Sequence, residues 1–97
     1  MSGTIRVTPE ELEQVADLYG KEGVEVHEQI VRLDKMIERL EGIWEGESSK
    51  AFQDQYIMLR PSFQDMEELL ESINRQLKST AGAIRDADAD IASQIRR

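Results

Sequence analysis

The sequence predicts an all-α fold, an antiparallel two-helix hairpin that pairs with a second hairpin into a four-helix bundle. Three observations support it: two long series of apolar residues spaced alternately by four and three, a short glycine-containing break between them, and few turn-forming residues. The chain of 97 residues is 39% hydrophobic and 33% charged, with 6 glycines and 2 prolines. This composition suits long amphipathic helices in a single domain, residues 1–97, better than a sheet or a disordered tail.

The first helix is expected at residues 9–41. Thr8 and the glutamate three positions later form a capping box, and Pro9 occupies the first helical position, where its missing N–H costs nothing. Glycines lower helix propensity, and at Gly23 we expect a close approach of the second helix rather than a bend. The core residues expected on this helix are Leu12, Tyr19, Val26, Ile30, Leu33, Ile37 and Leu40.

The break between the two apolar series is expected to be a turn at residues 42–47. Gly42 and Gly46 lie four positions apart on either side of Trp44, and both glycines can adopt the positive φ angles of a tight reversal. An indole at the end of a bundle can close the hairpin or be recognised by another protein. The sequence leaves both roles of Trp44 open.

The second helix is expected at residues 48–92. Pro61 removes one backbone hydrogen bond inside it, but the apolar spacing continues on both sides, so we expect one kinked helix rather than two. Its expected core residues are Phe52, Tyr56, Leu59, Phe63, Met66, Leu70, Ile73 and Leu77. Because apolar residues also flank both series, a second hairpin is expected to cover them, with a twofold dimer as the simplest arrangement.

Charge and composition exclude several classes of function. A formal net charge of -8 has the wrong sign for binding nucleic acid or an anionic membrane surface. With no cysteine, one histidine and no phosphate-binding glycine loop, the chain is expected to have no catalytic, cofactor or metal site and not to be an enzyme. His27, between Glu25 and Glu28, is expected to be a surface imidazole.

No stretch of the sequence reaches the ~20 apolar residues that a membrane span needs, so no stable membrane anchoring is expected. The first eight residues lack a charged head followed by an apolar run. Any export is therefore expected to proceed without a cleavable signal peptide.

The segment Trp44-Glu45-Gly46, at the turn of such a hairpin, resembles the Trp-x-Gly motif of the WXG family of small type VII (Esx, ESAT-like) secretion proteins. The resemblance covers essentially the whole chain. Trp-x-Gly alone is a weak match, but its central place between two long heptad series makes the combination specific. The resemblance implies that Trp44 and Gly46 form a secretion motif.

The C-terminal segment at residues 84–97 carries a second pattern, formed by Ile84, Asp88, Ile91 and Ile95. It resembles the hydrophobic-x-x-x-Asp-x-x-hydrophobic-x-x-x-hydrophobic tail of family members from low-GC Gram-positive bacteria, which implies one half of an export signal. No tyrosine follows Tyr56, so the tyrosine-containing tail of mycobacterial members is absent. This difference favours the homodimeric Gram-positive branch. Without the resemblance, the isoleucines would be read as bundle core and Asp88 as part of an acidic face.

The resemblance implies a secreted substrate or effector, or a co-secreted helper, of a type VII system. Such a protein is cytoplasmic before export and extracellular afterwards, and it leaves as a folded dimer with itself or with a WXG-family paralogue, recognised by the secretion ATPase. If two hairpins pack antiparallel, the turn of one lies beside the chain ends of the other, which would join turn and tail in one surface. Two other hypotheses remain open: a membrane-active helical effector, which the acidic faces disfavour, and an intracellular coiled-coil adaptor.

Overall fold

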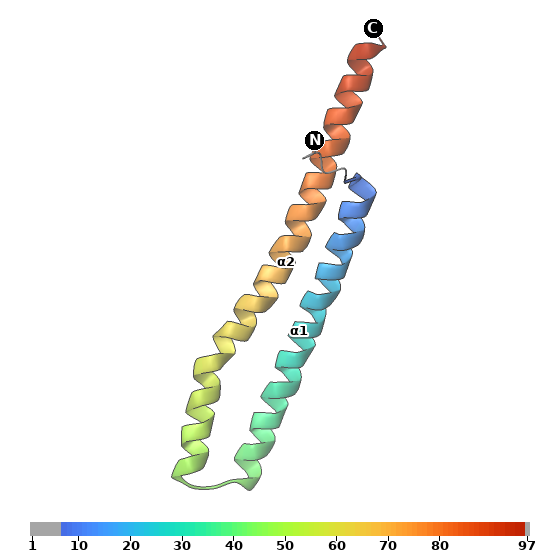
Figure 1. Ribbon diagram of the computed structural model, residues 1–97. Coiled ribbons are helices and arrows are strands. Elements are labelled where there is room, and N and C mark those ends of the chain that lie inside the picture. Colours follow the sequence, from blue (N-terminus) through green and yellow to red (C-terminus); the bar gives the residue numbers. More distant parts are fainter. Residues whose placement is uncertain (1–6, 97) are drawn as a thin grey trace, which may run out of the picture.

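A computed structural model describes residues 7–96 and contains two long antiparallel helices within that range (Figure 1). Helix α1 spans Pro9–Ile43 and α2 spans Glu47–Ile95, compared with the expected 9–41 and 48–92. The chain forms a rod with extents of 77 × 26 × 14 Å. The all-α hairpin that the two heptad series predict is therefore confirmed.

The start of α1 is fixed by side-chain capping. The Thr8 hydroxyl accepts a hydrogen bond from the Glu11 backbone N–H at 3.1 Å, and the Glu11 carboxylate accepts one from the Thr8 N–H at 3.3 Å. Pro9 takes the first helical position. This is the capping box that the sequence predicts, and it satisfies backbone donors that a helix start otherwise leaves free.

Helix α2 continues through Pro61 as a single element (Figure 1). The proline cannot donate a hydrogen bond to the preceding turn, which weakens the helix locally. A contact across the hairpin compensates at this level, because Arg60, directly before the proline, is paired with Asp34 of α1. The continuity of α2 agrees with the unbroken apolar spacing on both sides of Pro61.

Small residues bring the two helices together. A Cβ atom added at Gly23 would lie 3.6 Å from the Leu70 Cβ, and one added at Gly20 would lie 3.0 Å from the Asn74 Nδ2. The close approach expected at Gly23 is therefore present, and it extends to Gly20. Fully or nearly fully buried positions are few: within the described range they are Ala16, Gly23, Ile30, Ser49 and Ala81.

The hairpin has two contrasting long faces on either side of the line where the helices touch. Each face is built from one row of residues on each helix. Positions seven residues apart, or a multiple of seven, lie on the same side of a helix, so each row follows one side. We call the apolar face the surface formed by Leu12, Tyr19, Val26, Leu33 and Leu40 of α1 with Phe52, Leu59, Met66 and Ile73 of α2. We call the polar face the surface formed by Glu13, His27 and Asp34 of α1 with Arg60, Glu67 and Asn74 of α2.

Candidate functional site

The turn between the helices is short and depends on one glycine. Trp44 ends α1 in an extended backbone conformation, and its N–H donates to the Leu40 carbonyl at 2.8 Å. Gly46 precedes α2 with φ 110° and ψ -178°, a conformation that is essentially restricted to glycine. The expectation that Gly42 also supplies a positive φ angle is wrong. Gly42 lies inside α1, because the helix continues to Ile43 before the chain reverses.

The indole of Trp44 packs against the beginning of α2. Its ring centroid lies 5.7 Å from that of Phe52, and the two rings are inclined by 48°. Trp44 is 36% exposed and Phe52 is 42% exposed. The indole therefore closes the hairpin with one part of its surface and presents the rest to solvent, which leaves both of its predicted roles possible.

The four residues of the C-terminal pattern lie along one face of α2, as helical spacing by four and three requires. Ile84 is partly buried, whereas Ile91 and Ile95 are 55% and 78% exposed, and Asp88 is exposed. Figure 1 shows the reason, because the end of α2 projects beyond the start of α1. The face that packs on α1 along the hairpin thus continues into a segment with no α1 residue opposite it.

Turn and tail are not brought together within one chain. They lie at opposite ends of the rod, whose longest extent is 77 Å (Figure 1). A surface that combines Trp44 with Asp88 therefore requires two chains.

The residues expected in the core divide into two groups. The first group faces the other helix and is buried or partly buried between the two helices; examples are Ile30 of α1 and Phe63 and Leu70 of α2. Leu59 and Met66 are instead 50% and 52% exposed. The apolar stripe of α2 is wider than one neighbouring helix can cover, so these side chains lie outside the core of the single hairpin.

A groove lies in the middle of the apolar face. Val26 and Leu33 of α1 and Phe63 and Met66 of α2 line the same hollow, which places the rows of both helices on one side of the hairpin. Tyr19 and Phe52 extend this surface toward its two ends, each of them exposed in the single chain. The arrangement is that of a surface which a further pair of helices can cover.

The polar face carries the contacts that sequence reasoning missed. Asp34 Oδ1 and Oδ2 accept hydrogen bonds from Arg60 Nε and Nη2 at 2.9 and 2.8 Å, and the Tyr56 hydroxyl donates to Oδ1 at 2.5 Å. The hydrogen bond from Arg60, followed by that from Tyr56, lowers the pKa of Asp34. Partial burial, followed by the bond to Asp34, raises the pKa of Tyr56. This cluster is a link between helices rather than a reactive centre.

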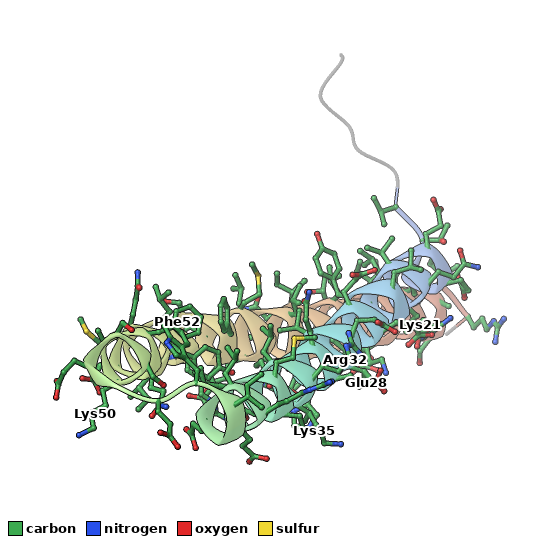
Figure 2. All side chains as sticks on the ribbon, turned by 90° about the horizontal axis from the view of Figure 1, so that it is seen from below. Lys21, Glu28, Arg32, Lys35, Lys50 and Phe52 are labelled. Atoms are coloured by element: carbon green, nitrogen blue, oxygen red, sulfur yellow. The ribbon has the colours of Figure 1, made fainter. Side chains whose placement is uncertain are left out.

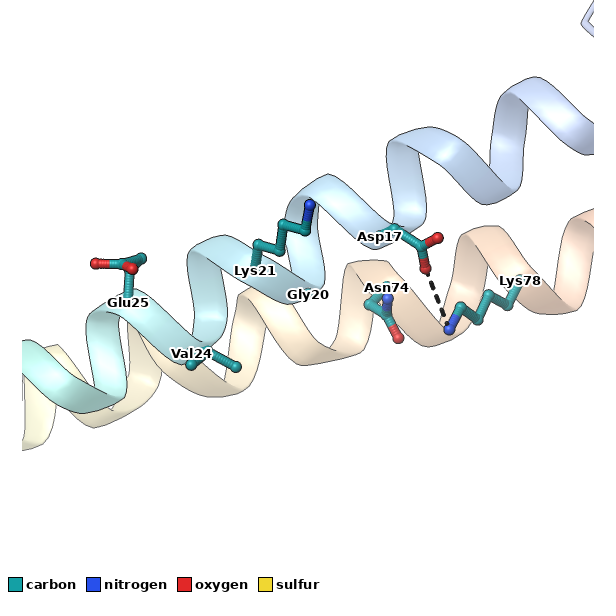
Figure 3. A pocket seen from close by; sticks show the side chains of 7 residues that line it. All are labelled: Asp17, Gly20, Lys21, Val24, Glu25, Asn74 and Lys78. Atoms are coloured by element: carbon teal, nitrogen blue, oxygen red, sulfur yellow. Dashed lines mark ion pairs between the residues drawn. The ribbon is translucent and has the colours of Figure 1, made fainter.

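Further polar contacts extend along the same face. Asn74 Nδ2 donates to the Ala16 carbonyl at 2.6 Å, and Lys78 Nζ lies 3.5 Å from Asp17 Oδ1 (Figure 3). His27 is an exposed imidazole, as expected, but its Nδ1 lies 3.1 Å from Glu67 of the other helix rather than beside its sequence neighbours. The signal that could have found this face is the row of polar residues spaced by seven next to the apolar rows.

Charged residues also cover the outside of α1. Figure 2 shows Lys21, Glu28, Arg32 and Lys35 pointing away from α2. Across residues 7–96, no cluster of three or more histidine and carboxylate side chains is placed to hold a metal ion. In the same part of the chain, neither helix is long and apolar enough to span a membrane.

Comparison with sequence families gives a match over most of the chain. The model described as "WXG100: Proteins of 100 residues with WXG" matches residues 4–89. Protein YukE of Bacillus subtilis is 53% identical over 96 residues, which covers 99% of both chains. The type VII secretion system extracellular protein A of Staphylococcus aureus is 28% identical over 91 residues, covering 94% of both chains.

Solved structures share the same hairpin. EsxA of Geobacillus thermodenitrificans superposes with a TM-score of 0.83 at 52% identity, covering 94% of this chain and 100% of the other. The secreted protein EsxB of Bacillus anthracis gives a TM-score of 0.79 at 34% identity, covering 90% and 99%. The similarity thus extends along both helices and includes the turn.

Proposed function

The chain belongs to the WXG100 family, and from this premise we propose that it is a type VII secretion substrate exported as a folded homodimer. Family members are small helical proteins, not enzymes. Two relatives support secretion, because one is named an extracellular protein of the type VII system and another a secreted protein. The organisms of the relatives agree with the Gram-positive branch that the tail pattern favours.

The observation that carries the proposal is the apolar face, whose side chains are only partly covered in the single hairpin. Its central residues Leu59 and Met66 are each about half exposed in the single chain. A second copy offers the same rows, so twofold pairing would cover both apolar faces at once and produce a four-helix bundle. A paralogue with equivalent rows would fit the same surface, but an identical copy is the simplest occupant.

Antiparallel pairing of two such hairpins would complete the export signal. The turn of one copy would lie beside the projecting tail of the other, bringing Trp44 of one chain near Asp88 and Ile91 of its partner. Both ends of the dimer would then carry the same composite surface. We propose that the secretion ATPase recognises this surface in the cytoplasm before export.

The test follows the protein in cell pellet and culture supernatant. Wild type, Trp44→Ala and a chain truncated after Ala83 are compared, with folding checked by circular dichroism and dimer mass by light scattering; Leu18→Ala, at an exposed position, is the control. We expect wild type and the control outside the cell and both signal variants, folded and dimeric, inside. Wild type retained in cells with an active secretion machine would overturn the proposal.

A mixed dimer tests the composite signal directly. The truncated chain keeps Trp44, and the Trp44→Ala chain keeps its tail, so their heterodimer has one end with both halves intact. Co-expression should therefore restore export of the pair. Failure of a verified heterodimer to leave the cell would contradict a signal shared between two chains.

A further inference from the structure

The base of the projecting tail is tied to the beginning of α1. Arg85 Nη2 donates to Glu13 Oε1 at 2.6 Å and lies 3.3 Å from Glu10 Oε1. Arg85 directly follows Ile84, the first residue of the C-terminal pattern, and both glutamates lie in the first turns of α1. Among the described residues, it is the hydrogen-bonded ion pair between the helices that lies nearest to the C-terminus.

Beyond Arg85, α2 has little to support it. Ile91 and Ile95 are 55% and 78% exposed, and Asp88 is exposed as well. A helical segment of about ten residues is marginal in water by itself. Its helical state and its direction therefore depend on how firmly the preceding turn is held.

The charges at this point favour the contact across the hairpin. The hydrogen bond to Glu13 is the main cause that raises the pKa of Arg85, and the same bond lowers the pKa of Glu13. The pKa of Glu10 is lowered by a backbone hydrogen bond and then by Arg85. Arg85 also precedes Asp88 by three positions, a spacing that allows an ion pair within one helix. While Arg85 binds α1, the carboxylate of Asp88 forms no ion pair with the described residues.

We infer that Glu10, Glu13 and Arg85 form a clamp that positions the export tail. The clamp fixes the point where the tail leaves the hairpin, keeps the following turns helical, and leaves the Asp88 carboxylate free for a receptor. These are positioning residues, because none of them belongs to the tail pattern itself. The inference rests on the proposed function, in which this tail is read during export.

The first test is hydrogen exchange of the purified full-length dimer. Arg85→Gln should speed amide exchange in residues 86–92 by about twofold to fivefold, the range expected for an exposed ion-pair network, and leave residues near the turn unchanged. Combining Glu13→Arg and Arg85→Glu, with Glu10→Gln to avoid a like-charge contact with the new carboxylate, should restore slow exchange. Arg75→Gln, which makes the same chemical change and removes an exposed ion pair with Glu71 within α2, is the matched control and should leave the tail unaffected. Equal tail exchange in wild type and Arg85→Gln would overturn the clamp.

The second test measures export of the same variants. Arg85→Gln should lower the secreted fraction, the charge-swapped pair should recover it, and Arg75→Gln should behave as wild type. Faster tail exchange with undiminished export would show that the clamp does not position a signal, and would overturn the inference. Failure of the proposed function gives a different result. The wild type itself would then stay in the cell, while the hydrogen-exchange experiment would still test the clamp.

Discussion

Asp34 and Arg60 form a bidentate ion pair between the two helices. Arg60 Nε donates to Asp34 Oδ1 at 2.9 Å, and Arg60 Nη2 donates to Asp34 Oδ2 at 2.8 Å. Bidentate pairs of this kind are stronger and more directional than single hydrogen bonds. The contact sits one residue before Pro61, where α2 lacks a backbone hydrogen bond. It therefore joins α1 to α2 at the level where Pro61 leaves α2 without one backbone hydrogen bond.

Replacing Asp34 tests the strength of this link. In Asp34→Asn the negative charge is lost and one of the two hydrogen bonds from Arg60 cannot form. We therefore expect the free energy of unfolding to fall by about 1 kcal/mol. Urea unfolding at neutral pH and fixed protein concentration measures it. Asp54→Asn, at an exposed position of α2 without an ion pair among the described residues, is the control. Equal stability of the two variants would show that the link contributes nothing.

The same carboxylate predicts a dependence of stability on pH. Hydrogen bonding by Arg60, and then by Tyr56, holds the pKa of Asp34 below its ordinary value of 3.8. A lowered pKa contributes stability above the ordinary value, and this contribution is lost as pH falls from there toward the folded-state pKa. Between about pH 5 and pH 2.5, wild type should therefore lose stability more steeply than Asp34→Asn. Parallel melting-temperature curves for the two proteins would contradict this.

Pairing through the apolar face predicts a difference between two otherwise similar substitutions. Leu33→Asp places a charge in the groove of the apolar face, where pairing would bury it, so the dimer should dissociate. Leu18→Asp makes the same chemical change at an exposed position outside the rows of that face and should leave the dimer intact. Light scattering of both proteins at equal concentration gives the masses. A Leu33→Asp dimer of unchanged mass would place the interface elsewhere.

The helices themselves were predictable because their signals are local. The capping box at Thr8 involves residues three positions apart, and the heptad spacing continues past Pro61 without a change of phase. The turn was less predictable, because Gly42 and Gly46 look alike in sequence. Only the actual length of α1 decides that Gly46 adopts the positive φ angle.

Which side of each apolar stripe packs against the other helix of the hairpin could not be predicted. A heptad series shows that a stripe exists, but it does not say which flank meets the other helix. On α2, Arg60 and Asn74 turned out to contact α1, whereas Leu59 is half exposed. Such contacts depend on the register between helices, which joins residues as distant in sequence as Ala16 and Asn74.

Gly46 offers a test of the turn. Its φ of 110° is unfavourable for any residue with a side chain, so Gly46→Ala should destabilise the protein by about 1–3 kcal/mol. Gly82→Ala is the matched control, because Gly82 lies within α2 and an added Cβ meets nothing within 4 Å. Helix propensity predicts that this change stabilises by up to about 1 kcal/mol. Opposite shifts in urea unfolding are expected, and a neutral Gly46→Ala would mean that the turn adopts another conformation.

Gly20 and Asn74 should be energetically coupled. A Cβ at Gly20 would lie 3.0 Å from Asn74 Nδ2, so in Gly20→Ala the Asn74 side chain, which donates to the Ala16 carbonyl at 2.6 Å, must shift by a few tenths of an ångström. The resulting strain, at most the value of that hydrogen bond or about 1 kcal/mol, offsets helix propensity gained of similar size. In an Asn74→Ala background the obstacle is gone, so the same Gly20→Ala change should stabilise by about 1 kcal/mol. Urea unfolding of the four proteins at one concentration completes the cycle, and strictly additive effects would show that this close approach does not limit the packing of the helices.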